Sequence, residues 1–400
     1  MSILNFNLSG FGLDITDKSI KLVQAVPVNN KYRLQAWGQV NIKPGLIEQG
    51  DIIKPEAILV LLNKLIGSLE GRLTSELAVV SLPETKSFLK LFKLKKVSGE
   101  EKKDDKDLLV KAIETELPKE IPLPLNNMVY DYQVVRESSN HWHVLVGAVP
   151  RDIVLEYTEL IKKAGFKPLA LEIEAQSITR ALIYGENGRS KKSVENKSRS
   201  KIKLDFLGKI LPKKIKQSQS PSKNLNNTVK QSASPPKSTI ITDLGANRSS
   251  LIVYHHETIQ FTRTLELSGA QLSQTIANKL GLTLQKAEQA KIICGLDPKK
   301  CKDKVRPLFN AWVQELTREI KATISYSNTL NGLNAAPQPN ILLCGGGAGL
   351  IGLAELLQKS LDLEVEVAVP LQKFIEPKKT KLIPSKSVLG YTTAIGLALR

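Results

Sequence analysis

Two aspartates occupy matching positions in the 400-residue sequence and could form a metal and phosphate site. Asp14 ends the apolar run of FGLDIT, Asp243 ends that of STIITDLG, and a short turn of hydroxyl-bearing and small residues follows each. A carboxylate at the end of a strand, beside the backbone N–H groups of a tight turn, suits Mg²⁺ and nucleotide phosphates. One such aspartate is an ordinary turn former, but two in matching positions favour the functional interpretation.

A glycine-rich turn offers a further contact for a nucleotide. In ILLCGGGAGLIGLAELLQKSL an apolar strand leads into Gly345, Gly346 and Gly347, and a helix follows. Glycines admit close approach of the backbone to a ligand, and a helix N-terminus carries unpaired N–H groups. The turn departs from the GxGxxG pattern and no βαβ unit begins the chain, which disfavours a dinucleotide-binding domain.

The strands that must position these residues follow one plan twice. Apolar and polar residues alternate in residues 32–42, and the other runs are short and bounded by turns, as is typical of strands. The predicted strands are residues 11–16, 19–26 and 32–42 in the first copy, and 238–245, 248–255 and 258–267 in the second. The sequence therefore predicts two three-stranded meanders, each with an aspartate at the end of its first strand.

A small α+β unit is predicted from about residue 87 to 167, inserted within the first copy. Its helices end where Pro118 and Gly165 stop them, as helix-terminating residues do. The predicted helices and strands are residues 104–117, 128–135, 141–149 and 151–164.

Residues 186–237 carry +11 of the net charge of +18 and are rich in Ser, Asn and Gln. This composition predicts a disordered insertion. Within it, residues 201–216 have apolar and basic side chains at helical spacing and could contact anionic lipid, the alternative being a solvated linker. Nucleic acid is disfavoured because Phe206 is the one aromatic residue available to stack on bases.

The composition fits a soluble cytosolic protein of two or three domains. Mean hydropathy is −0.13, and no run approaches the roughly 18 apolar residues that a membrane helix needs. The N-terminus lacks the features of a signal peptide. The cysteines Cys294, Cys301 and Cys344 are odd in number and show no CxxC spacing, so buried free thiols are expected.

Taken together, these features resemble the actin-like ATPase superfamily and, within it, the type IV pilus assembly PilM family, which is related to the cell-division protein FtsA. The resemblance covers nearly all of the chain outside residues 186–237. The segments that carry it are GLDITDKSIKLVQ, PGLIEQGDIIKPEAI, SLPETKSFLKLF, ELPKEIPLPLNNMVYDYQVV, GAVPRDIVLEYTELIKKAGFKPLALEIEAQSITRAL, TDLGANRSSLIVY, LSGAQLSQTIANKLGLTLQKAEQAK, GGGAGLIGL and GYTTAIGLALR.

The resemblance implies an α/β fold in which two ribonuclease H-like domains face each other across a nucleotide cleft, with inserted subdomains. The implied limits are 1–86 with 168–185 and 376–400 for the first domain, 87–167 for a peptide-binding subdomain, 186–237 for the basic insertion, 238–267 with 338–375 for the second domain, and 268–337 for a helical subdomain.

ATP and Mg²⁺ are the implied ligands, with Asp14 and Asp243 acting on the metal through water. Lys21 would reach phosphate oxygens. The remaining implied contacts are Gly245, Ala246, Asn247 and Ser249 for the second phosphate loop, Gly345, Gly346 and Gly347 for adenosine, and Glu288 and Lys291 around the ribose and adenine. For the last two, an ordinary exposed charged pair is the alternative.

Two residues bear on catalysis. Relatives usually place Gly where this chain has Thr16, whose side chain could clash with a phosphate or donate a hydrogen bond to it. Nucleotide binding is therefore expected, with weak or absent hydrolysis. Glu174 could orient the attacking water, or could simply be an acid favoured by the dipole at a helix N-terminus.

The resemblance also implies a partner: the cytoplasmic N-terminal peptide of a PilN-like inner-membrane protein, received by the inserted subdomain. Tyr130, Tyr132 and Val134 are candidates for contacting it, the alternative being that they are sheet-facing core residues. The protein would then be peripheral to the inner membrane, with ATP as a conformational clamp and with self-association open. The alternatives are an FtsA-like element that polymerises at the membrane and a small-molecule kinase on the same fold.

Overall fold

The structure is a computed structural model that describes residues 10–96, 105–183, 238–330, 338–375 and 381–400. The predicted basic insertion, with its amphipathic segment 201–216, lies outside the described residues. No helix within the described ranges combines the length and apolar character needed to cross a membrane.

The first sheet contains the first predicted meander. Its strand order is β11-β7-β1-β2-β3-β17, with the short β6 (Glu70–Gly71) also paired to β3. β1, β7 and β11 are parallel neighbours, so their carboxyl ends meet at one edge. The bounds are β1 Phe11–Ile15, β2 Ser19–Val28, β3 Lys31–Asn41, β7 Leu77–Leu82, β11 Lys167–Ile173 and β17 Phe374–Ile375.

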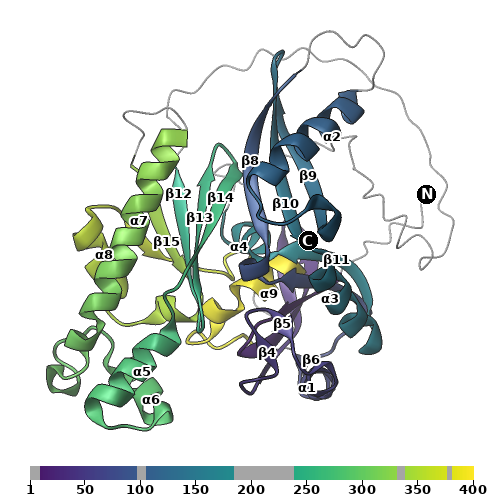
Figure 1. Cartoon of the computed structure of the whole chain (residues 1–400). Helices are drawn as coiled ribbons and strands as arrows, with labels where there is room; N and C mark the ends of the chain where they lie inside the picture. The colour runs from purple at the N-terminus through teal and green to yellow at the C-terminus, as the bar shows by residue number, and fades with distance from the viewer. Residues whose placement is uncertain (1–9, 97–104, 184–237, 331–337, 376–380) are drawn as a thin grey trace. The chain divides into compact units, whose positions relative to one another are not determined.

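Helices α1 (Pro55–Gly67), α3 (Arg151–Lys163), α4 (Glu174–Leu182) and α9 (Thr392–Ala398) contact strands of this sheet (Figure 1). The buried apolar side chains of the strands and these helices form one core. A short hairpin of β4 (Ile47–Glu48) and β5 (Asp51–Ile52) lies beside them.

The second sheet contains the second predicted meander. Its order is β16-β15-β12-β13-β14-β8-β10-β9, and β15 runs parallel to β12. The bounds are β8 Phe88–Lys95, β9 Met128–Glu137, β10 His141–Pro150, β12 Thr239–Leu244, β13 Ser249–His255, β14 Thr258–Leu265, β15 Asn340–Cys344 and β16 Val365–Val367. Both predicted meanders are confirmed.

Strands β12 to β16 of the second sheet and four helices share a separate core, and together they form the second lobe; the first sheet and its helices form the first lobe. The four helices are α5 (Gly269–Leu280), α6 (Leu284–Cys294), α7 (Asn310–Leu330) and α8 (Leu353–Leu361). Ser268 caps α5 through a reciprocal pair of hydrogen bonds with Gln271, and Gly281 ends that helix in the left-handed conformation.

The helices and strands predicted between residues 104 and 164 are confirmed within a few residues. α2 (Asp105–Glu116) packs on one face of β8, β9 and β10 around a third core that includes Trp142 and Ile113 (Figure 1). These strands extend the second sheet because β8 pairs with β14 at Lys90 and Phe261. The inserted segment is thus hydrogen-bonded directly to the second lobe.

Helices α4 and α9 cross at very close range. A Cβ added at Gly396 would lie 1.8 Å from the carbonyl oxygen of Ser177. Buried Glu172 accepts two hydrogen bonds from Arg180, at 2.8 and 2.9 Å, and one from Arg400. The crossing therefore depends on a glycine and is held by a buried carboxylate.

The expectation of three free cysteines was wrong for two of them. Cys294 and Cys301 form a disulfide with a Cα–Cα distance of 5.8 Å, whereas Cys344 is free and buried, as predicted. Cys294 ends α6, and Gly295 follows with φ 54° and ψ −141°, a conformation that reverses the chain. Spacing alone did not reveal this reversal, which brings two cysteines seven residues apart together.

Candidate functional site

Four acidic residues meet between the two sheets. Asp14 lies at the end of β1, Glu84 follows β7 in a short 3₁₀ turn (Glu84–Lys86), and Glu174 begins α4 directly after β11. Asp243 comes from the end of β12 in the second sheet. Burial raises the pKa of Glu174 and Asp243, and the charge of Asp14 raises both further. Glu84 also raises the pKa of Glu174, and Asp243 raises that of Glu84, so the four acids lie within electrostatic reach of one another.

Asp14 is almost fully buried and has two polar partners. Ser81 donates a hydrogen bond of 3.1 Å to its Oδ1, and Lys21 Nζ lies 3.7 Å from its Oδ2. Lys21 faces Asp14 because the two residues are paired across β1 and β2. Burial raises the pKa of Asp14, while Lys21 and Ser81 lower it, and the net direction is upward.

Glu84 and Glu174 are buried near each other, and the charge of Glu84 contributes to the raised pKa of Glu174. Burial raises the pKa of Glu84 to about 7, and the side chain of Thr262 and the backbone of Ala175 partly offset this rise. Burial also raises the pKa of Glu174 well above its usual value, reinforced by the neighbouring acids. Glu84 Oε2 is buried, and no described residue forms a hydrogen bond with it.

Asp243 is held beside the glycine turn of the second lobe. Cys344 lies opposite it on the parallel strand β15, with Sγ 3.7 Å from Asp243 Oδ1. Burial raises the pKa of Asp243 to about 6, and the charge of Asp14 adds to this effect. Gly345 has φ +77°, and a Cβ there would lie 2.3 Å from Asp243 Oδ1. This position therefore needs glycine because of Asp243 as well as its backbone conformation.

The other glycines of this turn differ in their surroundings. A Cβ at Gly347 would lie 2.9 Å from Leu244 Cβ, whereas a Cβ at Gly346 would meet nothing within 4 Å. The turn is thus packed against the end of β12 on one side and open at Gly346. Its predicted contact with adenosine stays a prediction.

Thr16 closes the turn between β1 and β2. Its hydroxyl accepts from the N–H of Ser19 at 3.2 Å and donates to the Ser19 carbonyl at 3.1 Å. Its φ is not among the positive values of the chain, so a threonine fits the turn without strain. Thr16 therefore supports the hairpin that carries Asp14 and Lys21.

The second phosphate loop predicted at residues 245–249 forms the turn between β12 and β13. A Cβ at Gly245 would lie 2.3 Å from the carbonyl oxygen of Arg248, so the tightness of the turn requires glycine. The hydroxyl of Ser249 donates to the Leu267 carbonyl at 2.8 Å. Ala246 accepts a hydrogen bond from the N–H of Ala270 in α5 at 2.9 Å. The loop is thus held by the start of α5.

The two turns contact each other. Asn247 Nδ2 donates to Asp17 Oδ2 at 3.4 Å, and the same carboxylate accepts from the N–H groups of Gln49 and Gly50 at 3.1 Å each. The structure thus brings the predicted residue Asn247 against the hairpin of the first lobe.

Glu288 and Lys291 are also brought to this region. Lys291 Nζ donates to Glu288 Oε2 and to the carbonyl of Gly269, both at 2.8 Å, and Ser273 donates to the same carboxylate. Gly269 itself donates to the carbonyl of Gly245 at 3.1 Å. The pair therefore ties α6 to the start of α5, beside the second loop.

Glu84 and Asp17 were missed by the sequence analysis. Glu84 could have been found by one signal: it follows an apolar strand, as Asp14 and Glu174 do. Recognising it also required knowing that β7 lies between β1 and β11 in parallel. Asp17 looks like a common turn residue, and its role depends on contacts with Gln49, Gly50 and Asn247.

The donor set fits a hydrated divalent cation. Within the described ranges, no three His, Cys, Asp or Glu side chains are placed to hold a metal directly. Four acidic side chains nevertheless share a buried region in which Lys21 pairs with Asp14, and Glu84 Oε2 has no hydrogen-bond partner. A cation bound through water would offset this concentration of negative charge.

The candidates for peptide contact lie on β9, beneath α2. Tyr130, Tyr132 and Val134 are partly buried and pack against the core under α2, and the hydroxyl of Tyr130 donates to Glu114 Oε1 at 2.9 Å. In the described part of the chain, β9 pairs with β10 along one side and forms the edge of the sheet.

Comparison with known proteins supports this description. Residues 12–195 and 218–400 match the family described as type IV pilus assembly protein PilM. A solved PilM–PilN type IV pilus biogenesis complex contains a chain with 20% identity and a TM-score of 0.71, over 98% of both chains. The ethanolamine utilization protein EutJ of Carboxydothermus hydrogenoformans gives 13% identity and a TM-score of 0.50, over 98% of this chain and 89% of that one. The predicted actin-like ATPase fold is confirmed.

Proposed function

The chain belongs to the type IV pilus assembly protein PilM family, and from this premise we propose that it is an ATP-binding scaffold of type IV pilus assembly or a related secretion machine. It would work at the cytoplasmic side of the inner membrane, held there by a PilN-like membrane protein. ATP binding would close the two lobes and so control the contact with that partner.

The observation that carries the nucleotide proposal is the convergence of acids from both lobes. Asp14 comes from the first sheet and Asp243 from the second, and the charge of the former raises the pKa of the latter. When bound, MgATP would supply a hydrated divalent cation together with negatively charged phosphates. Asp14 and Asp243 would then hold the hydrated cation from both sides, which stabilises the closed arrangement.

The phosphate contacts would come from the two turns. Lys21 would turn from Asp14 toward phosphate oxygens, and the backbone N–H groups of residues 245–247 would donate to them. The proposed site is acidic, so binding would depend on the cation: without it, the carboxylates of Asp14 and Asp243 would repel a triphosphate. Glu288 and Lys291 would line the ribose side.

Hydrolysis would be slow or absent. Glu174 is the candidate to orient water, and burial together with neighbouring acids raises its pKa well above the usual value. A carboxyl group that keeps its proton to higher pH is less often available as a base. The nucleotide would therefore act through binding rather than through turnover.

The inserted segment would receive the partner peptide. β9 offers an edge strand next to α2, which suits an extended peptide that adds a strand or lies beside the helix. β8 of the same segment pairs with β14 of the second lobe. Closure of the lobes would thus change the position of the peptide site through a direct strand contact.

Calorimetric titration with MgATP tests the nucleotide proposal. Wild type should bind, and Asp14→Asn and Asp243→Asn should each weaken binding at least tenfold, since each removes a carboxylate that holds the hydrated cation. Chelation of Mg²⁺ should abolish binding, and the exposed Glu355→Gln should behave as wild type. Phosphate release measured on the same samples gives the turnover rate. Wild type that binds equally well with the metal removed would refute the proposed site.

A second titration tests the clamp. A synthetic peptide with the cytoplasmic N-terminal sequence of a PilN-like protein is added with and without saturating MgATP. The clamp predicts a change of at least fivefold in peptide affinity, and this change should be lost in Asp243→Asn. Equal affinities would refute the clamp, and nucleotide-dependent sedimentation of filaments would favour the FtsA-like alternative.

A further inference from the structure

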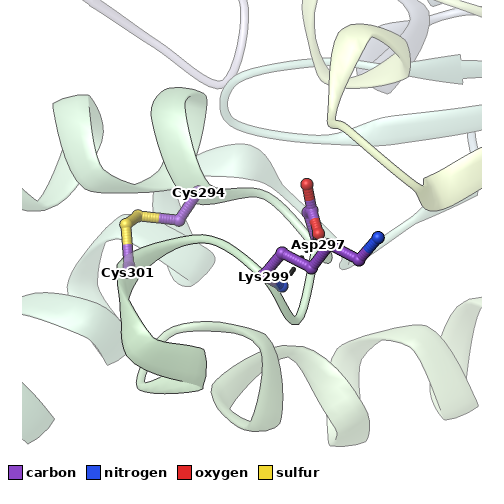
Figure 2. The surroundings of a disulfide bond; sticks show 4 residues. All are labelled: Cys294, Asp297, Lys299 and Cys301. Atoms are coloured by element: carbon purple, nitrogen blue, oxygen red, sulfur yellow. Dashed lines mark hydrogen bonds between the residues drawn. A yellow bond between two sulfur atoms is a disulfide. The ribbon is translucent and has the colours of Figure 1, made fainter.

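A disulfide closes the loop that follows α6. It joins Cys294, the last residue of the helix, to Cys301 at the start of a 3₁₀ turn (Cys301–Asp303) (Figure 2). Cys294 is 2% exposed and belongs to the core of the second lobe, whereas Cys301 is exposed. Inside the loop, the N–H of Lys299 donates to Asp297 Oδ1 at 2.9 Å. One cysteine of the bond is thus accessible and the other is protected.

The loop lies against the chain that leaves the glycine turn. The N–H of Leu296 donates to the carbonyl of Ile351 at 2.8 Å. Gly295 lies so close that a Cβ there would be 2.7 Å from Ile351 Cβ, and a Cβ at Gly352 would be 3.3 Å from Leu296 Cβ. Ile351 and Gly352 connect the turn Gly346–Gly349 to α8. The disulfide loop therefore supports the segment that directly follows, in sequence, the turn proposed to contact adenosine.

The surroundings of Cys301 favour thiol chemistry. Lys300 and Lys302 are its sequence neighbours, and Lys299 and Lys304 lie within three residues. Positive charge near an exposed cysteine stabilises its thiolate and attracts an attacking thiolate. Disulfides of cytosolic proteins are commonly transient and redox-sensing rather than structural.

We propose that Cys294–Cys301 is a thiol–disulfide exchange site that controls nucleotide affinity, reduced by a dithiol protein of the thioredoxin class. A thiolate of the reductant attacks Sγ of Cys301, and the S–S bond breaks with Cys294 leaving as a thiolate that takes up a proton. The second thiolate of the reductant then attacks its own sulfur in the mixed disulfide and releases Cys301, which is protonated in turn. The reductant ends as a disulfide, so two electrons and two protons reach this chain.

Reduction should loosen the loop because its two ends are no longer joined. The contacts of Leu296 and Gly295 with Ile351 would then open more often, and the glycine turn would lose its support. The nucleotide part of the inference rests on the proposed function. We expect reduction to weaken MgATP binding about tenfold, within the range typical of coupling between sites.

The first experiment follows the chemistry itself. The full chain is oxidised with oxidised glutathione, then treated under native conditions with reduced thioredoxin, and free thiols are alkylated and mapped by mass spectrometry. The expected result is native-state reduction of Cys294–Cys301, and a thioredoxin variant that lacks its second cysteine should be trapped as a mixed disulfide at Cys301. A bond that fails to form, or that thioredoxin reduces only after denaturation, would overturn the proposal.

The second experiment measures the consequence in the oxidised and reduced protein. Hydrogen exchange at the Leu296 amide should be at least tenfold faster after reduction, and calorimetry should show the tenfold loss of MgATP affinity. The double variant Cys294→Ala with Cys301→Ser should show the exchange rate and MgATP affinity of the reduced protein, and thioredoxin should change neither. A cooperative thermal unfolding transition would show that the variant is folded. Equal exchange in both states would refute the inference. If neither state binds MgATP, the proposed function fails, while the exchange at Leu296 still decides whether the disulfide controls the loop.

Discussion

Replacing Glu84 by glutamine should stabilise the nucleotide-free protein in a pH-dependent way. Glu84 is buried, one of its carboxylate oxygens has no hydrogen-bond partner in the described part of the chain, and burial raises its pKa from the usual 4.5 to about 7. At 1.36 kcal/mol per pKa unit, this corresponds to roughly 3 kcal/mol. Glutamine has nearly the same shape as glutamate but carries no charge.

The sign follows from the protonation states. Below about pH 4.5 Glu84 is protonated in both the folded and the unfolded chain, so its ionisation costs no stability there. Between about pH 4.5 and 7 the folded state holds a proton that the unfolded state releases, so the wild type loses stability as the pH rises. Glu84→Gln should therefore match the wild type near pH 4.5 and exceed it by about 3 kcal/mol above pH 7.5.

Urea unfolding followed by tryptophan fluorescence at several pH values, without nucleotide or divalent cation, measures this difference. The exposed Glu355→Gln serves as the matched control and should leave the free energy of unfolding unchanged at every pH. An advantage of Glu84→Gln that is equal at pH 5 and pH 8 would refute the reasoning, because the gain would then have no link to ionisation of the carboxylate.

Two glycine substitutions should be harmful for different reasons. Gly396→Ala places a Cβ 1.8 Å from the Ser177 carbonyl oxygen, so α4 and α9 must move apart. We expect urea unfolding to show a loss of about 3 kcal/mol in the free energy of unfolding, and a loss below about 1 kcal/mol would contradict the close crossing. Gly345→Ala places a Cβ 2.3 Å from Asp243 Oδ1 at a residue with φ +77°, so calorimetry should show MgATP binding weakened at least tenfold. Gly346→Ala is the control, because a Cβ there meets no described atom within 4 Å and the fold should be retained. Unchanged affinity in Gly345→Ala would show that the turn does not contribute to nucleotide binding.

Much of the site could be predicted from the sequence because its parts are local. Asp14 and Asp243 stand at strand ends that alternation and turn residues reveal, and the duplicated meander places them in matching positions. The glycine turn likewise follows directly from a short apolar strand. β1 is buried along its whole length and β12 along nearly all of it, so short apolar runs bounded by turn residues predict these strands.

Other features depend on packing between distant segments. Glu84 lies near the other three acids because β7 is between β1 and β11 in the sheet, and no local sequence pattern predicts that strand order. Asp17 gains its role from contacts with Gln49, Gly50 and Asn247, and the β8–β14 pairing links segments separated by more than 160 residues.

The cysteines show most clearly the difference between features that are local and features that depend on packing. Local patterns specify the two meanders, the paired aspartates and the glycine turn, because neighbouring residues set strands and turns through backbone conformation and solvent exclusion. Packing between distant segments is what joins Cys294 to Cys301, buries Glu84 and makes glycine necessary at Gly345 beside Asp243. Pairing, burial and close approach are properties of the packed chain, and the electrostatics of the site follow from them.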